Sequence, residues 1–180
     1  YAAIQDVILK YYNFSETDTW KVNMMSLVYM IAYLPATLVA SVVLQKKGLR
    51  FSVTLGSLLN FIGSWIRLAA FHRTQDARTS SMLFWIAFGG QTIAAIGQPF
   101  IVNCVTQCSV NWFGEKERAL ATAIASFFNM LGSAVAFGLA PLMAGNGSEV
   151  GMVSYLGAQA LFCSFTLVAI VALFTERPPT

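Results

Sequence analysis

Long apolar blocks alternate with short polar segments along the whole chain. Five blocks, residues 22–44, 51–71, 82–110, 119–143 and 151–174, are each mostly apolar. Each is roughly 20 residues or longer, which is the length a helix needs to cross about 30 Å of hydrocarbon. Lipid offers no partners for backbone N–H and C=O groups, so each block should be a helix that pairs these groups internally. The pattern therefore predicts an all-α, polytopic membrane protein.

The composition argues against the main alternative, a soluble all-helical domain with long buried helices. The chain is 57% hydrophobic and only 11% charged, and its mean hydropathy is +0.64. Soluble domains are typically about one quarter charged. Polar residues do not recur at helical spacing, as the outer face of a soluble helix bundle would require. A membrane protein is the better interpretation.

The two ends of the chain are more polar than the five blocks. Residues 1–14 read YAAIQDVILKYYNF, which is too short and too polar to cross a bilayer alone and lacks the layout of a signal peptide. We expect this stretch to be the end of an earlier helix, and the final TERPPT to precede a linker. The chain should then hold five complete spans and the end of a sixth, from a longer protein or from a truncated gene product.

Lysine and arginine gather in one set of alternate loops. The segment LQKKGLRFS at 44–52 carries three cations, and the loop at 111–118 adds two more. Such an excess marks the cytoplasmic side. Gly48 should supply the left-handed backbone that ends a helix in this turn. The glycosylation triplets at Asn13 and Asn146 both fall on the opposite, external side.

The basic turn also contains a recognisable motif. The run Gln45-Lys46-Lys47-Gly48-Leu49-Arg50 resembles the major facilitator signature Asp-Arg/Lys-x-Gly-x-x-Arg/Lys. The loop NWFGEKERALA resembles the Trp-Phe…Glu-Arg…Ala pattern between spans four and five of that superfamily. The resemblance implies spans two to six of a twelve-span transporter, that is, an N-terminal six-helix bundle with most of its first helix missing and the C-terminal bundle absent. It also implies a gating role for Gln45, Lys46, Gly48, Arg50, Glu117 and Arg118.

Longer strings narrow the resemblance. SLVYMIAYLPA, QKKGLRFSVTLGSLLNFIGSWIR, GGQTIAAIGQPF, WFGEKERALATA and NMLG resemble the family of the feline leukaemia virus subgroup C receptor, solute carrier family 49. Members of that family are associated with choline and ethanolamine, haem or pyridoxine transport. The chain departs from the signature at Gln45, where the family has an acidic residue. An amide lacks the charge-assisted part of that residue's hydrogen bonds, so the gating equilibrium should differ or another residue should take over.

The block 82–110 holds the first candidates for substrate contact. Gln91 and Gln98 are seven residues apart and so lie on one face of a helix. An amide facing lipid at mid-span would lose its hydrogen bonds, at a cost of about 2–7 kcal/mol. Gln98 should therefore face either a partner helix or an aqueous cavity, and the resemblance implies that it binds the substrate, with Gln91 as a weaker candidate. Asn103 and Gln107 should support packing or the inner mouth.

Other blocks add further candidates. Tyr29 and Tyr33 are four residues apart and offer rings for a cation and hydroxyl groups, although such aromatics are often core or interface residues. Asn129 precedes a stripe of small residues that repeat every four positions: Gly132, Ala136, Ala140 and Ala144. Gly138 and Pro141 are either a gating hinge, as the resemblance suggests, or a structural kink.

Charged groups inside the blocks are few. Asn60 and Arg67 lie seven residues apart on one face. An arginine at mid-bilayer costs about 2.5–3.5 kcal/mol on insertion scales and is a functional candidate by default. Arg67 lies near the external end and can snorkel to water, so a structural or anchoring role is favoured over a functional one. His72, the single histidine, should lie on the solvated external rim. None of the five blocks contains a carboxylate, and Asp6 lies in the N-terminal stretch expected to end an earlier helix, so a proton relay is not expected in this half.

These features favour transport of a small organic solute by alternating access, of choline/ethanolamine type or haem-related. The alternative is a non-transporting receptor or scaffold, or a truncated product of a transporter gene. We find no catalytic set, cofactor motif or metal-ligand spacing, and Cys104, Cys108 and Cys163 are expected to be packing residues. The expected partners are the substrate, the lipid bilayer and the C-terminal bundle of the same protein, with no nucleic acid. The plasma membrane is the favoured location, with endolysosomal or other internal membranes as alternatives.

Overall fold

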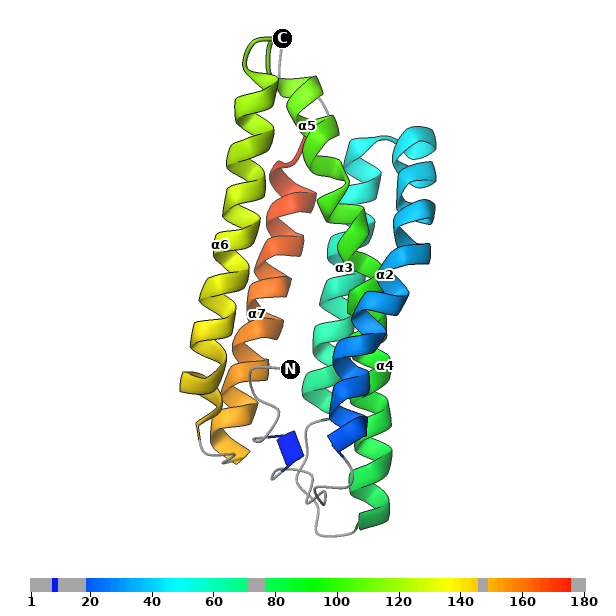
Figure 1. Ribbon diagram of the computed structural model, residues 1–180, viewed down its shortest axis with the longest axis vertical. Coiled ribbons are helices and arrows are strands. Elements are labelled where there is room, and N and C mark those ends of the chain that lie inside the picture. The colour runs from blue at the N-terminus through cyan, green and yellow to red at the C-terminus, as the bar shows by residue number, and fades with distance from the viewer. Residues whose placement is uncertain (1–7, 10–18, 71–76, 146–148, 176–180) are drawn as a thin grey trace.

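The structure is a computed structural model that describes residues 8–9, 19–70, 77–145 and 149–175. Its long elements are helices that run along a common axis (Figure 1). In chain order they are α2 (Thr19–Lys47), α3 (Leu49–Ala69), α4 (Ala77–Val102), α5 (Cys104–Trp112), α6 (Arg118–Ala144) and α7 (Glu149–Leu173). The prediction of an all-α fold is confirmed.

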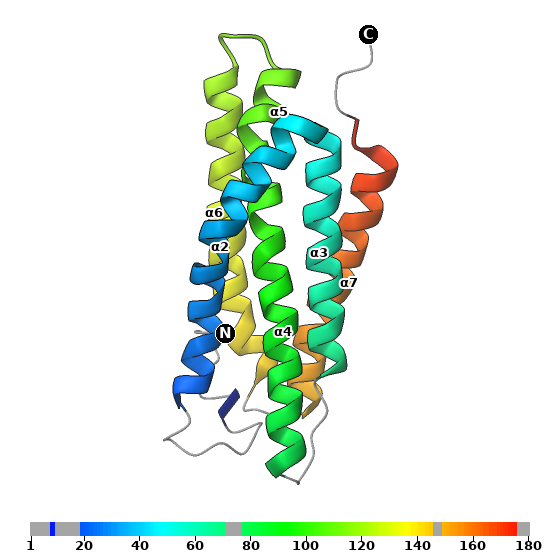
Figure 2. The same cartoon turned by 90° about the vertical axis from the view of Figure 1, so that its right-hand side faces the viewer.

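The predicted block 82–110 lies within one candidate membrane span, Ser81–Trp112. Within it, a local turn at Asn103 separates α4, which ends at Val102, from α5, which begins at Cys104. Pro99 supplies the physical reason: it has no N–H to bond to the carbonyl of Ala95, so the last turn of α4 is less constrained. The N–H of Asn103 still donates to the Pro99 carbonyl at 3.0 Å. As a result α5 continues α4 beyond a local turn (Figure 2).

Among the described residues, four helical segments are long and apolar enough to cross a membrane: Trp20–Lys47, Ser81–Trp112, Arg118–Ala144 and Val150–Leu173. These segments are those of a polytopic membrane protein. The helix α3 has 21 residues but is not among them, since it carries two arginines and several hydroxyl side chains. Its crossing of the bilayer as a fifth span stays a prediction.

The helices form two groups joined through α3. The first group is α2, α3 and α4, in which the contact between α3 and α4 is the most extensive. The helix α7 packs on α3, and α6 packs on α7 and α5. The α2–α3 turn and the α5–α6 loop lie at the same end of the molecule (Figure 1), so both cationic segments do as well. That this end faces the cytoplasm stays a prediction. The described residues do not include four positions discussed above: Asp6, Asn13, His72 and Asn146.

Buried apolar side chains form two clusters. The larger one lies toward the end opposite the cationic turns and includes Met25 of α2, Phe84 of α4, Ala140 of α6 and Leu156 of α7. The smaller one consists of Leu49, Val53 and Cys104, near the cationic end. Many large apolar side chains are exposed instead, for example Leu142 at 79% and Met130 at 74%. Such a surface suits hydrocarbon rather than water.

Candidate functional site

The helices α3 and α4 approach each other through two pairs of glycines. A Cβ added to Gly63 would lie 2.6 Å from the carbonyl oxygen of Gly90, and one added to Gly56 would lie 2.9 Å from that of Gly97. The reverse contacts, from Gly90 and Gly97, are also 2.9 Å. Even a methyl group would therefore not fit at these positions without a shift of the helices. We call this contact, made by Gly56, Gly63, Gly90 and Gly97, the glycine seam.

A buried arginine extends the glycine seam. Arg67 is only 6% exposed, and its Nη1 donates to Oε1 of Gln91 at 2.7 Å. The expectation that Arg67 snorkels to water is wrong, because the missing side chain of Gly90 leaves room for the arginine stem. A Cβ on Gly90 would lie 3.0 Å from Cγ of Arg67. The guanidinium also lies in the last turn of α3, where the helix dipole favours a cation.

Gln98 differs from Gln91 although both lie on one face of α4. Gln91 is buried and held by Arg67, whereas Gln98 is half-buried. Among the described residues, no hydrogen bond to the side-chain amide of Gln98 is formed. An amide at this depth is costly unless a ligand, water or another helix satisfies it. The role of Gln98 as a substrate ligand stays a prediction.

The other predicted substrate contacts are spread over the molecule. Tyr29 and Tyr33 are half-buried on α2, and Asn129 is exposed on α6. The carbonyl oxygen of Asn129 accepts a hydrogen bond from the Ser133 hydroxyl of its own helix at 3.1 Å. The structure therefore does not gather Gln98, the two tyrosines and Asn129 into one cavity of the described chain.

The signature turn has the backbone that its glycine predicts. Gly48 has φ 86° and ψ 175°, a conformation essentially restricted to glycine, and its N–H donates to the Leu44 carbonyl at 3.1 Å. The predicted positive φ is confirmed. Two residues later, Nη2 of Arg50 donates to the carbonyl of Val171 at 3.3 Å. This bond links the start of α3 to the last turn of α7, while Gln45 and Lys46 are exposed.

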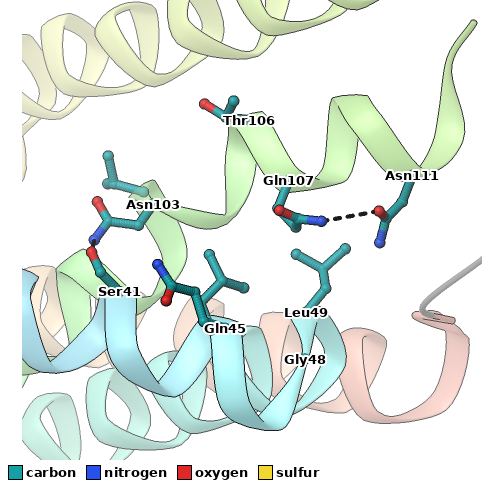
Figure 3. Close-up of a pocket in the computed structure, with 10 residues that line it drawn as sticks. Ser41, Gln45, Gly48, Leu49, Asn103, Thr106, Gln107 and Asn111 are labelled. Carbon is teal, nitrogen blue, oxygen red and sulfur yellow. Dashed lines mark hydrogen bonds between the residues drawn. The ribbon is translucent and has the colours of Figure 1, made fainter.

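A polar cavity of about 700 Å³ lies between the end of α2 and α5 (Figure 3). Nδ2 of Asn103 is 3.4 Å from both the Thr37 carbonyl and the Ser41 hydroxyl, and Gln107 donates to Oδ1 of Asn111 at 3.2 Å. None of the lining side chains is charged. They are Ser41, Leu44, Gln45, Gly48, Leu49, Val102, Asn103, Thr106, Gln107 and Asn111.

This cavity lies between the signature turn and the local turn that separates α4 from α5. Gln45 was expected to act in gating, and Asn103 and Gln107 were expected at packing positions or at the inner mouth. The structure brings all three onto one polar surface near the cationic end. Gln98 does not line it. Gating by this surface stays a prediction.

The second motif forms a compact loop between α5 and α6. Nε of Arg118 donates to the Phe113 carbonyl at 3.2 Å, and the N–H of Glu117 donates to the Gly114 carbonyl at 2.9 Å. The hydroxyl oxygens of Thr122 and Ser109 are 2.9 Å apart, which connects the two helices. An apolar cavity of about 560 Å³ between α5 and α6 includes Glu117 in its lining.

The predicted hinge lies within an unbroken helix. The helix α6 continues past Pro141 to Ala144, and the Pro141 carbonyl accepts a hydrogen bond from Gly145 at 3.0 Å. Gly138 has no neighbour within 4 Å of an added Cβ. Of the small-residue stripe, Ala140 and Ala144 are buried while Gly132 and Ala136 are exposed. A hinge at Gly138 and Pro141 stays a prediction.

Comparison with known proteins decides the family. The family model described as the Major Facilitator Superfamily matches residues 1–180. The chain belongs to the Major Facilitator Superfamily.

Relatives within the superfamily agree with the narrower resemblance. The chain is 37% identical over 185 residues to an MFS-type transporter of Caenorhabditis elegans whose name calls it uncharacterized. It is 31% identical over 187 residues to the choline/ethanolamine transporter flvcr2a of Danio rerio, and 30% over 197 residues to the choline/ethanolamine transporter FLVCR1 of Mus terricolor. These matches cover 99%, 100% and 99% of this chain, but only 29%, 37% and 33% of the relatives. The predicted resemblance to the subgroup C receptor family is confirmed.

Sequence reasoning about this superfamily member missed the glycine seam. Each of the blocks 51–71 and 82–110 holds two glycines seven residues apart, which is a signal for close packing of antiparallel helices. The bond between Arg67 and Gln91 was also missed, since Gln91 was interpreted as a weak substrate contact. Two hydrogen bonds between α3 and α7 could not be predicted from the sequence. Arg50 donates to the Val171 carbonyl, and Nε1 of Trp65 donates to the Ser164 hydroxyl at 3.1 Å. Within the described ranges, no group of three or more His, Cys, Asp or Glu residues could hold a metal ion.

Proposed function

We propose that the full-length protein carries a small organic solute of the choline/ethanolamine type across a membrane by alternating access. The observation that carries the proposal is Gln98, a half-buried amide whose side chain has no partner among the described residues. The relatives that this chain resembles are named choline/ethanolamine transporters. The more general statement, that the chain is part of a multi-pass membrane protein of a transporter superfamily, rests on the family match and on the apolar helices.

The chemistry of such a solute fits the neutral groups available. The hydroxyl of choline or ethanolamine can donate to the amide oxygen of Gln98 and accept from its nitrogen. Aromatic faces attract a quaternary ammonium group without a buried carboxylate, and Tyr29 and Tyr33 are the aromatic candidates on α2. We place the remaining contacts in the parts of the protein outside this chain, because alternating access needs a second bundle that rocks against this one around a shared site.

Labelled choline uptake by the full-length protein tests the proposal. Gln98→Ala should raise KM about tenfold, because a lost hydrogen bond of about 1.4 kcal/mol corresponds to that factor. Gln159→Ala is the matched control, since Gln159 is a half-buried glutamine on α7, and it should leave uptake unchanged. Equal kinetics for the wild type and the Gln98 variant would remove Gln98 from the site.

Further arms of the same assay separate the alternatives. Unlabelled ethanolamine should compete with choline, whereas competition by haem alone would favour a haem-related substrate. Uptake by intact cells whose protein is labelled at the surface would place transport at the plasma membrane rather than at an internal one. Binding of a protein partner with no solute flux would support the receptor or scaffold alternative.

A further inference from the structure

The glycine seam and Arg67 occupy one continuous strip of the contact between α3 and α4. The pairs Gly56 with Gly97 and Gly63 with Gly90 follow an antiparallel register, and the bond from Arg67 to Gln91 lies just beyond the second pair. Ser52 extends the strip in the other direction, where its hydroxyl donates to the Phe100 carbonyl at 3.3 Å. The strip covers most of the length of α3.

A seam of this kind fixes the rotation of α4 about its own axis. The close approach is possible only when the four glycines face one another, because a side chain in their place would meet the opposite backbone. The hydrogen bond between Arg67 and Gln91 adds a side-chain contact that holds α4 in this rotation. Because the Arg67 stem fits over Gly90 and its guanidinium reaches Gln91, the bond forms only when this face of α4 is turned toward α3.

Gln98 lies two turns from Gln91, so both residues follow the same rotation of α4. We propose that Arg67 is a positioning residue: by holding Gln91, it sets the direction in which the Gln98 amide points. This inference rests on the proposed function of Gln98. In this proposal Arg67 neither snorkels to water nor contacts the substrate, because its hydrogen bond is to Gln91 and not to Gln98.

A cysteine at position 98 reports its direction without requiring transport. In the full-length protein with Cys104, Cys108 and Cys163 replaced by serine or alanine, Gln98→Cys is exposed to a small cationic methanethiosulfonate reagent. The measured quantity is the labelling rate in membranes. We expect the parent to be labelled and Arg67→Met to lower the rate at least about fivefold, a change within the range of coupled side chains.

Two neighbouring glycines provide a matched pair of variants that keep the Arg67 side chain. An added Cβ on Gly90 would lie 2.9 Å from the Gly63 carbonyl oxygen and 3.0 Å from Cγ of Arg67, whereas one on Gly89 meets nothing within 4 Å. Gly90→Ala should therefore lower the labelling rate at position 98, and Gly89→Ala should leave it unchanged. The exchange Arg67→Gln with Gln91→Arg keeps both groups in the seam and should restore the rate partly. These variants remain informative if Arg67→Met does not fold.

The outcomes separate this inference from the proposed function. A labelling rate that is unchanged in both Arg67→Met and Gly90→Ala overturns the positioning role, whatever choline uptake shows. A rate that falls in both variants, in a protein that takes up no choline, supports the positioning role and overturns the proposed function. A parent that is not labelled at position 98 overturns both, because no water-facing amide would then need to be positioned.

Discussion

The contact between α3 and α4 and the helix α6 are built from similar residues but packed in opposite ways. Both contain glycines and alanines at regular spacing. In the seam, four glycines bring backbones together so closely that an added Cβ would lie within 3.0 Å of a neighbour. On α6, Gly132 and Gly138 have no neighbour within 4 Å, and Phe127 and Phe128 are each 62% exposed. A small residue therefore indicates close packing only where the facing helix also carries one.

The difference suggests different tasks for the two regions. The seam joins α3 and α4 into one unit with polar bonds across it, which suits a fixed frame for a binding residue. The helix α6 touches only α5 and α7 extensively among the described elements, and most of its side chains face outward. Three pairs of substitutions contrast these regions, and a fourth compares two tryptophans of α3 and α4. Each is measured as the thermal or denaturant stability of the purified protein in detergent.

The largest contrast is between two phenylalanines. Phe84 of α4 is 1% exposed in the larger apolar cluster, and Phe128 of α6 is 62% exposed. Phe84→Ala should lower the free energy of unfolding by about 3–5 kcal/mol, because it leaves a cavity in a packed core. Phe128→Ala should change it by less than about 0.5 kcal/mol, the usual range for surface sites. Equal losses would mean that α6 is packed as tightly as α4.

Next are two glycines in the two helices. Gly63→Ala should destabilise by about 1–3 kcal/mol, because the methyl group would overlap the Gly90 carbonyl oxygen. Gly132→Ala should be neutral or stabilising by up to about 1 kcal/mol, since alanine favours helix and the site has open space. Stability curves of the two variants that coincide would contradict the close approach of α3 and α4.

Two arginines give a contrast of about the same order. Arg67→Met should cost about 1–3 kcal/mol, because the buried Gln91 carbonyl loses its donor. Arg118→Met should cost less than about 0.5 kcal/mol, since its guanidinium bonds to the exposed loop at Phe113. An Arg67 variant as stable as the wild type would show that the buried bond adds nothing to the seam.

The smallest contrast is between two tryptophans. Trp65→Phe removes the donor to Ser164 and should cost about 0.5–1.5 kcal/mol. Trp85→Phe keeps an aromatic ring beside Phe84 and Phe88 and should have a smaller effect. If the hydrogen bond between Trp65 and Ser164 links α3 to α7, Trp65→Phe should unfold at a lower midpoint than Trp85→Phe. The reverse order would contradict it.

The fold was largely predictable because membrane insertion constrains local sequence strongly. Each long helix coincides with an apolar block, and Gly48 takes the positive φ that its place in the turn requires. The local turn at Asn103 was not predicted, since Pro99 alone can bend a helix without ending it. The site was less predictable, because side-chain partners depend on helix rotation. Gln91 and Gln98 look equivalent along the chain, and only the position of Arg67 on α3 separates them.

The central claim is that the seam presents Gln98 to a water-filled site that binds choline. Protection of a cysteine at position 98 tests it most directly, in the full-length protein with the native cysteines replaced. Saturating choline should slow labelling of Gln98→Cys by a cationic thiol reagent, while labelling of Gln159→Cys, on α7 and outside the proposed site, should be unaffected. A labelling rate at position 98 that choline does not change would contradict the account.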